Sequence, residues 1–146
     1  MPFNTLDANL SASPQLTPDD VANAAAHGFR TIIDNRPDGE EPGQPSAATI
    51  RAAARDHGLA FVHIPVVSGQ VGDSNVDAMT RALAEQPGPA LGYCRTGTRV
   101  ATLWALAQSG MVEPDVLLNS AREAGYDLEK LRPRLKPAAG SDANGL

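Results

Sequence analysis

The sequence changes from a strand pattern to a helix pattern at ALGYCRTGTRV, residues 90–100. The apolar residues 90–93 predict a short strand that runs into Cys94, and the apolar run from Val100 to Ser109 predicts a helix that Gly110 ends. A short loop with one glycine joins the two patterns. Ligand sites of open α/β proteins lie at the carboxyl ends of strands. The stretch therefore predicts an α/β fold with a candidate site at Cys94.

The rest of the chain alternates helix and strand patterns in the same way. Further helices are expected over residues 18–27, 47–57, 73–86, 113–124 and 127–132. Further strands are expected over 29–34 and 59–67. Residues 10–15 could add an edge strand, but Pro14 within them counts against it. This alternation predicts three layers, with a mostly parallel central sheet and helices on both of its faces. We expect one domain over residues 1–132. Residues 133–146 are rich in Pro, Ala and Gly and predict a disordered tail.

Composition excludes several classes of function. The 146 residues carry a net charge of −5, whereas a general nucleic-acid binder or a protein bound to anionic membranes has a basic surface. No apolar run approaches the roughly 20 residues that span a bilayer. The first residues match no signal peptide, and one cysteine allows neither an internal disulfide nor a multi-cysteine zinc site. We therefore expect a cytoplasmic protein without a metal or other cofactor.

The loop after Cys94 has the features of an anion-binding site. Arg95 and Arg99 supply two positive charges, and the backbone N–H groups of Arg95, Thr96, Gly97 and Thr98 converge near the start of a helix. Such surroundings favour the thiolate form of a cysteine, which is the reactive form. The alternative is a small buried side chain that only packs. The density of positive charge favours Cys94 as a nucleophile and Arg99 as the residue that holds an anionic substrate.

The loop resembles two known families with related chemistry. The tyrosine and dual-specificity phosphatases have a cysteine, five residues and an arginine, while the rhodanese sulfurtransferases often have Cys-Arg-x-Gly-x-Arg. Arg99 follows Cys94 after four residues, so the spacing matches the rhodanese loop. Three separated motifs, GFRTIIDNRPDGE at 28–40, HIPV at 63–66 and GYCRTGTR at 92–99, are together similar to the beta-lactamase-hydrolase-like, phosphatase-like family. The resemblance covers about residues 5–125.

The resemblance implies a dual-specificity-phosphatase-like fold and a cysteine-dependent sulfur transferase. Family members are also found fused to persulfide-processing hydrolase domains, which implies a partner domain that acts in trans. The implied substrates are a small anionic sulfur donor, such as thiosulfate or a low-molecular-weight persulfide, and a thiol acceptor. A phosphoester is the substrate in the alternative case.

Two arguments favour sulfur transfer over phosphate hydrolysis. A loop one residue shorter has one N–H group fewer for a phosphoryl group, which spreads charge over three oxygens, whereas a persulfide sulfur is a single atom. The loop that follows the strand ending at Val67 has no acidic residue before Asp73 to protonate a leaving oxygen. A phosphatase with a phosphocysteine intermediate and a non-catalytic module that binds anions or persulfides remain the alternatives.

Three acidic residues are weaker candidates for the site, either as an acid or as a group that supports the anion-binding loop: Asp38, Glu41 and Asp73. Asp38 and Glu41 follow the strand over 29–34, whose end lies on the same sheet edge as Cys94, and either could orient Arg99 or act as an acid. Turn formation around Pro37 and Gly39 is the competing explanation. The run that Asp38 forms with Glu40 and Glu41 is more typical of a solvated surface than of a metal site.

Overall fold

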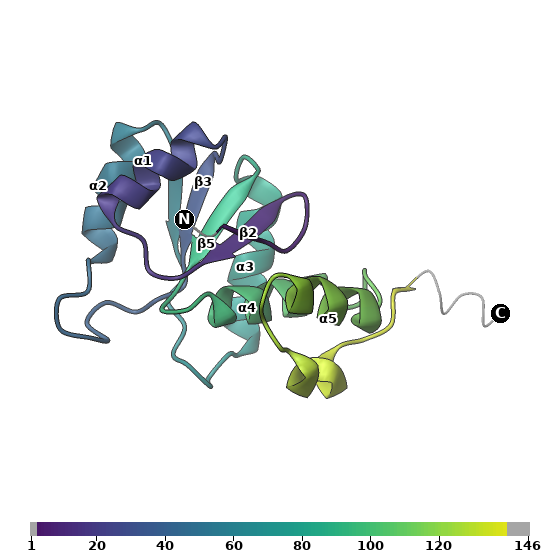
Figure 1. The fold of residues 1–146 in the computed structure, drawn as a ribbon. Helices are drawn as coiled ribbons and strands as arrows, with labels where there is room; N and C mark the ends of the chain where they lie inside the picture. Colours follow the sequence, from purple (N-terminus) through teal and green to yellow (C-terminus); the bar gives the residue numbers. More distant parts are fainter. Residues whose placement is uncertain (1–2, 140–146) are drawn as a thin grey trace.

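A five-stranded sheet forms the centre of the computed structural model, which describes residues 3–139 (Figure 1). The strands are β1 (Asn4–Thr5), β2 (Leu10–Ser13), β3 (Thr31–Asp34), β4 (Ala60–His63) and β5 (Ala90–Tyr93). They lie in the order β1-β2-β5-β3-β4, and every neighbouring pair is parallel except β1 and β2. The sheet confirms the predicted α/β class, and its central strand, β5, is the one that precedes Cys94.

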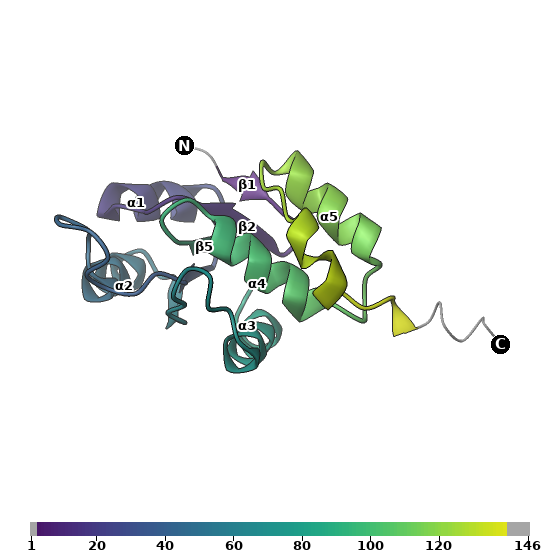
Figure 2. The same ribbon diagram turned by 90° about the horizontal axis from the view of Figure 1, so that it is seen from below.

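Helices cover both faces of this sheet. They are α1 (Pro18–Ala26), α2 (Ala47–Asp56), α3 (Asp73–Glu85), α4 (Thr98–Gln108), α5 (Pro114–Glu123) and the 3-10 helix η1 (Glu129–Arg134). Helices α1 and α2 pack side by side on one face, and α3 and α4 pack side by side on the other (Figure 2). Helix α5 lies against α4, and η1 lies against α5. The predicted three-layer arrangement is therefore confirmed.

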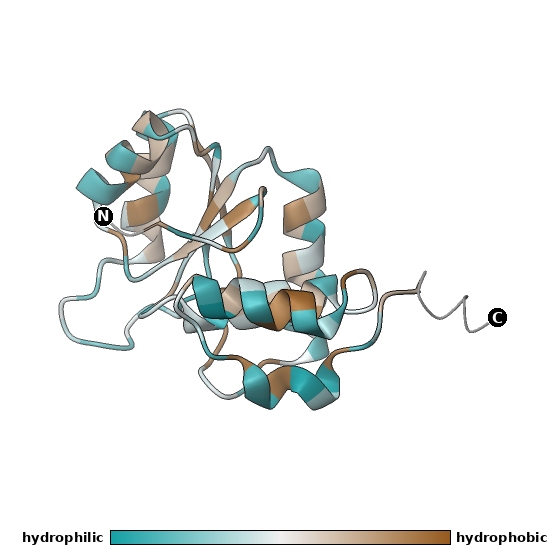
Figure 3. Ribbon diagram, turned by 45° about the vertical axis from the view of Figure 1, so that its right-hand side comes forward, coloured by the Kyte–Doolittle hydropathy of each residue, from teal (hydrophilic) through white to brown (hydrophobic). Residues whose placement is uncertain are grey.

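The sheet separates two apolar cores. Along β3, Ile32 belongs to the core under α1 and α2, while Ile33 belongs to the core under α3 and α4; both are fully buried. Adjacent strand residues point to opposite faces, so a strand buried on both faces requires consecutive apolar residues. Each helix carries both hydrophilic and hydrophobic residues, which alternate along it as the colouring in Figure 3 shows. Among residues 3–139, no helix is both long and apolar enough to cross a membrane.

Local sequence signals explain where the helices begin. At α1, the Thr17 side chain accepts a hydrogen bond from the N–H of Asp20, and the Asp20 side chain accepts one from the N–H of Thr17. At α2, the Ser46 hydroxyl accepts a hydrogen bond from the N–H of Thr49. Helix α4 begins at Thr98, immediately after the glycine of the Cys94 loop.

Three strands differ in extent from the prediction, and one of them, β3, begins at Thr31 rather than at residue 29. The possible edge strand over 10–15 is β2, which ends at Ser13, just before Pro14. Strand β4 ends at His63 rather than at Val67. Hydrogen bonds to the end of β3 and the residue after it still continue past Pro65, which has no N–H itself: the N–H of Ile64 donates to the Asp34 carbonyl, and the N–H of Val66 donates to the Asn35 carbonyl.

The C-terminal segment differs from the predicted disordered tail. Leu135 is buried in the core on the α4 side of the sheet. The N–H of Lys136 donates to the Ser109 hydroxyl at 2.9 Å, and the N–H of Ala139 donates to the Gly110 carbonyl at 2.8 Å. One buried leucine and backbone partners at the end of α4 therefore order residues 133–139 despite their composition. The remainder of the predicted tail, 140–146, lies outside the described residues.

Candidate functional site

Cys94 directly follows β5 at the carboxyl edge of the sheet, as predicted. Its N–H donates to the Ser13 carbonyl at 3.4 Å, so the neighbouring strand β2 fixes its backbone. Its Sγ accepts a hydrogen bond from the N–H of Gly97 at 3.1 Å, and the residue is only 1% exposed. The sulfur therefore lies at the base of the loop 94–99, held by the loop's own backbone.

Gly97 allows the loop to turn into α4. Its φ of 99° lies in the left-handed region, and a Cβ atom here would collide with the Tyr126 hydroxyl. That hydroxyl donates to the Thr96 carbonyl at 3.3 Å and accepts a hydrogen bond from Asn4 Nδ2 at 2.9 Å. Tyr126, which comes after α5, therefore supports the loop from outside.

The positive end of α4 faces the same loop. Thr98 is the first residue of the helix, and its hydroxyl lies 3.1 Å from that of Thr96. The Arg95 side chain is 65% exposed, whereas the Arg99 side chain is 10% exposed and lies inside the site. A helix start with an adjacent arginine attracts anions. The predicted loop residues are therefore brought together around Cys94.

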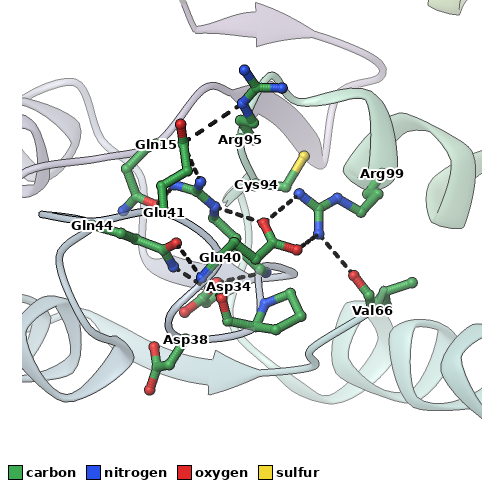
Figure 4. Close-up of polar contacts among 12 residues, drawn as sticks. Gln15, Asp34, Asp38, Glu40, Glu41, Gln44, Val66, Cys94, Arg95 and Arg99 are labelled. Carbon is green, nitrogen blue, oxygen red and sulfur yellow. Dashed lines mark hydrogen bonds and ion pairs between the residues drawn. The ribbon is translucent and has the colours of Figure 1, made fainter. Parts of the chain in front are cut away.

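Arg99 is held by a carboxylate rather than exposed to solvent. Its two terminal nitrogens donate to Glu40 at 2.8 and 2.9 Å, and one of them also donates to the Val66 carbonyl at 2.8 Å (Figure 4). Two parallel N–H···O bonds are the strongest arrangement between an arginine and a carboxylate. The Arg99 guanidinium is consequently fixed beside Cys94, with its paired donors already engaged.

Arg36 adds a second, buried arginine to the site. It follows β3, is only 2% exposed, and donates through Nε to Glu40 at 2.8 Å and through a terminal nitrogen to Gln15 at 2.9 Å. It also forms an ion pair with Glu41. Glu40 therefore bridges Arg36 and Arg99, and links the loop after β3 to the loop after β5.

This network determines the charge of the carboxylates. The hydrogen bond from Arg99, and less strongly that from Arg36, lowers the pKa of Glu40 to about 2. Glu40 is therefore ionised near neutral pH and has no proton to donate. Nearby, burial raises the pKa of Asp34 at the end of β3, and burial together with the Asp34 charge raises that of Tyr93.

Two cavities meet at the arginines of the loop. One, of about 490 Å³, is lined by Arg36, Glu40, Glu41, Ser68, Arg95 and Arg99. The other, of about 360 Å³, is lined by Ser68, Gly69, Val71, Arg95, Thr96, Thr98, Arg99, Thr102, Leu131 and Arg134. The first is mostly charged, and the second contains apolar side chains suited to the organic part of a substrate. Cys94 is buried and lines neither cavity, although its neighbour Arg95 lines both.

The three weaker candidates occupy different places. Asp38 lies in the turn at 38–39, as the turn explanation expects, and its side chain accepts a hydrogen bond from the N–H of Ala47 at 2.8 Å, at the start of α2. Glu41 lines the charged cavity and lies 3.6 Å from Arg95. Asp73 is the first residue of α3 and lines a separate pocket with Lys136. None of the three orients Arg99, because that contact belongs to Glu40.

Sequence reasoning missed Glu40 and Arg36 as parts of the site. It interpreted Glu40 as part of a solvated surface, although its side chain is 25% exposed and bonded to two arginines. The available signal was the position of both residues just after β3, a strand that neighbours β5 in the sheet. Tyr126 carried no signal, because it reaches the loop only through the packing of α5.

A family model covers most of the chain. Residues 2–111 match the model described as "Beta-lactamase hydrolase-like protein, phosphatase-like domain". A beta-lactamase hydrolase-like protein of Xylella fastidiosa is 36% identical over 136 residues, which are 92% of this chain and 32% of that protein. One from Agrobacterium fabrum is 34% identical over 111 residues, 75% of this chain and 26% of that protein. The chain thus spans about a third of the length of these relatives.

Solved structures with this fold are described as phosphatases. A crystal structure from Neisseria meningitidis, described as a "putative phosphatase", is 38% identical, with a TM-score of 0.83 over 92% of this chain and 96% of that one. A structure named Tk-PTP has a TM-score of 0.69 at 16% identity, over 90% of each chain, and shows a shared fold alone. The fold is that of the tyrosine and dual-specificity phosphatases, and the chain belongs to the family of beta-lactamase hydrolase-like, phosphatase-like domains.

Proposed function

We propose that this chain is a cysteine-dependent phosphoester hydrolase in which Cys94 is the nucleophile. The observation that carries the proposal is the position of the Cys94 sulfur, which accepts the Gly97 N–H at the end of the central strand, beside Arg99 and the start of α4. The family and the fold support phosphoester hydrolysis better than the sulfur transfer that the loop length favours.

The reaction has two balanced steps. The Cys94 thiolate attacks phosphorus, an S–P bond forms, and the P–O bond to the leaving group breaks, so that the leaving oxygen takes the electron pair. Water then attacks the phosphocysteine, the S–P bond breaks, and phosphate leaves while the thiolate is restored. Arg99 and the loop N–H groups stabilise the charge on the equatorial oxygens in both steps.

The substrate class follows from the partners of the accessible acidic side chains around the site. Glu40 is ionised, Glu41 is paired with Arg36, and Asp38 accepts a backbone N–H. Residues 64–72, which connect β4 to α3, contain no acidic side chain. A leaving group that departs without protonation, such as a phenolate, therefore suits the site better than an alkoxide.

Steady-state hydrolysis of p-nitrophenyl phosphate and of glycerol phosphate tests this proposal. We expect turnover of the aryl ester only, and a loss of about a thousandfold or more in Cys94→Ser. Arg99→Lys keeps the charge but loses the paired donors and should raise KM by about tenfold, while Arg122→Lys, on the exposed surface of α5, serves as the matched control. Equal turnover by Cys94→Ser would contradict the nucleophile.

Sulfur transfer is the second candidate, because Arg99 follows Cys94 after four residues. Here the Cys94 thiolate attacks the outer sulfur of thiosulfate, the S–S bond breaks, and sulfite leaves with the electron pair. The persulfide then gives its outer sulfur to a thiol acceptor. The relatives are about three times as long, so we also propose that a persulfide-processing hydrolase domain would act with this one in trans in that case.

The length of the loop separates the two candidates. Inserting one glycine between Gly97 and Thr98 adds an N–H group to the ring and should raise aryl phosphate hydrolysis relative to sulfur transfer from thiosulfate. The same insertion at the exposed Gly43, in the loop before α2, is the control. An unchanged ratio of the two activities would mean that ring size does not select the chemistry.

A further inference from the structure

The Glu40 carboxylate occupies the atoms of Arg99 that a substrate would use. An oxyanion with two free oxygens binds an arginine through the same pair of N–H groups that Glu40 engages at 2.8 and 2.9 Å. Figure 4 shows the carboxylate and the guanidinium facing each other, with the Cys94 sulfur next to them. Any anion that reaches the paired donors of Arg99 must therefore displace Glu40.

The charges around the cavity make that displacement depend on the charge of the anion. Arg36, Arg95 and Arg99 line it together with Glu40 and Glu41, which leaves one net positive charge. Arg36 and Arg99 both hold Glu40, and Arg36 and Arg95 both pair with Glu41. A doubly charged anion is repelled by a retained carboxylate about twice as strongly as a singly charged one, because Coulomb energy is proportional to charge.

We propose that Glu40 shapes the substrate specificity of the Cys94 site by weakening the binding of doubly charged anions more than that of singly charged ones. The inference deepens the proposed function, since it rests on an anionic substrate bound over Cys94. It predicts that loss of the Glu40 charge strengthens the binding of phosphomonoesters more than that of phosphodiesters of similar shape. The burial of Cys94, at 1% exposure, fits a site that stays covered until a suitable anion displaces the carboxylate.

Protection of the single cysteine from alkylation measures anion binding without turnover. Benzylphosphonate and its monomethyl ester share one organic group and carry two charges and one charge at pH 9. The first contains no ester bond, and the second could release only methoxide, an alkoxide that the site is not expected to expel. Each would be titrated against the rate at which iodoacetamide modifies Cys94. The resulting dissociation constants would be compared in the unmodified protein and in Glu40→Gln.

We expect Glu40→Gln to lower the dissociation constant of benzylphosphonate by about tenfold and that of the monomethyl ester by about threefold. The anion with half the charge gains half the electrostatic binding energy when the carboxylate is removed. Glu85→Gln removes the same charge from the exposed end of α3 and should change neither constant. Glu41→Gln removes a charge from the cavity but leaves the carboxylate that binds Arg99 in place. It should therefore change both dissociation constants less than Glu40→Gln does. Should Glu40→Gln fail to fold, as circular dichroism would reveal, Glu40→Asp should still tighten the dianion more than the monoanion.

Three results would overturn the inference. Unchanged or weaker binding of both anions in Glu40→Gln would make Glu40 a residue that only positions Arg99. Equal tightening of both anions would mean that Glu40 blocks the site without discriminating charge. If neither anion protected Cys94 in any variant, there would be no anion site over Cys94, and the proposed function would be wrong as well. In that last case alone, hydrolysis of aryl phosphates would also be absent.

Discussion

At the scale of single residues, Arg99 has two roles that oppose each other. Its bond to Glu40 fixes the guanidinium beside Cys94, which saves the cost of ordering a long side chain when substrate binds. The same bond must be broken, at least in part, before an anion can take its place. A site with such a carboxylate gains a well-placed arginine and loses affinity for every anion, most of all for the most highly charged.

The ion pair of Glu40 predicts a particular dependence of stability on pH. The pKa of Glu40 is lowered from 4.5 to about 2 in the folded protein. The ionised carboxylate therefore contributes its full share of the folding stability above pH 4.5, and this share disappears as the pH falls towards 2. Glu40→Gln should therefore lower the free energy of unfolding at pH 7 by about 1 kcal/mol and make less difference at each lower pH. Urea unfolding between pH 7 and pH 2 measures this.

The exposed variant Glu85→Gln controls for the loss of one negative charge. It should leave the stability profile within experimental error of the unmodified protein. A constant difference between Glu40→Gln and the unmodified protein from pH 7 to pH 2 would show that the ionised form of Glu40 does not stabilise the fold.

At the scale of elements, the loop 94–99 depends on the packing of α5 as well as on its own sequence. Gly97→Ala would place a Cβ atom at positive φ against the Tyr126 hydroxyl. We expect a loss of stability of about 2 kcal/mol or more, together with a displaced Cys94 and a lower kcat for aryl phosphate. Thermal unfolding and hydrolysis kinetics would measure both effects.

Gly43 provides the matched control for this substitution. It has a φ of 80° with open space around it. Gly43→Ala should therefore lower the stability only through backbone strain, by about 1 kcal/mol, and should leave kcat unchanged. Adding Tyr126→Phe to Gly97→Ala removes the colliding hydroxyl and should restore part of the lost stability. Equal effects of Gly97→Ala and Gly43→Ala would mean that Tyr126 does not constrain the loop.

The sequence predicts the elements around the site better than the contacts between them. Alternating patterns identified β5 and α4, because a strand buried on both faces and an apolar helix both leave local signals. The partner of Arg99 left no such signal. Asp38, Glu40 and Glu41 lie within four residues, and only the path of the loop after β3 decides which carboxylate reaches across to the loop after β5. Pairing across neighbouring strands is a tertiary property that local composition does not encode.

At the scale of the whole molecule, the segment after η1 completes the core. Leu135 is 7% exposed and belongs to the same apolar cluster as Trp104 of α4. Leu135→Ala should lower the free energy of unfolding by about 2–3 kcal/mol, because it removes buried apolar surface and leaves a cavity. Urea unfolding measures this effect. Met111→Ala, at a side chain that is 65% exposed, should change it by less than about 0.5 kcal/mol.

A result of the opposite kind would change the domain boundary. If Leu135→Ala and Met111→Ala had the same small effect, the packing of Leu135 would contribute nothing to stability, and the domain would end at residue 132, as the composition suggests. The Pro-rich composition of this segment misleads because it reports average tendencies, whereas one leucine in a fitting pocket is enough to hold a short segment.

The central claim is that Cys94 forms a covalent bond to phosphorus, and intact-protein mass after rapid acid quenching tests it most directly. With p-nitrophenyl phosphate, we expect one added phosphoryl group on the unmodified protein and none on Cys94→Ser. Thiosulfate and glutathione persulfide would be examined in parallel. No phosphoryl adduct, together with one added sulfur atom on Cys94 from either donor, would contradict the phosphatase and assign the site to sulfur transfer.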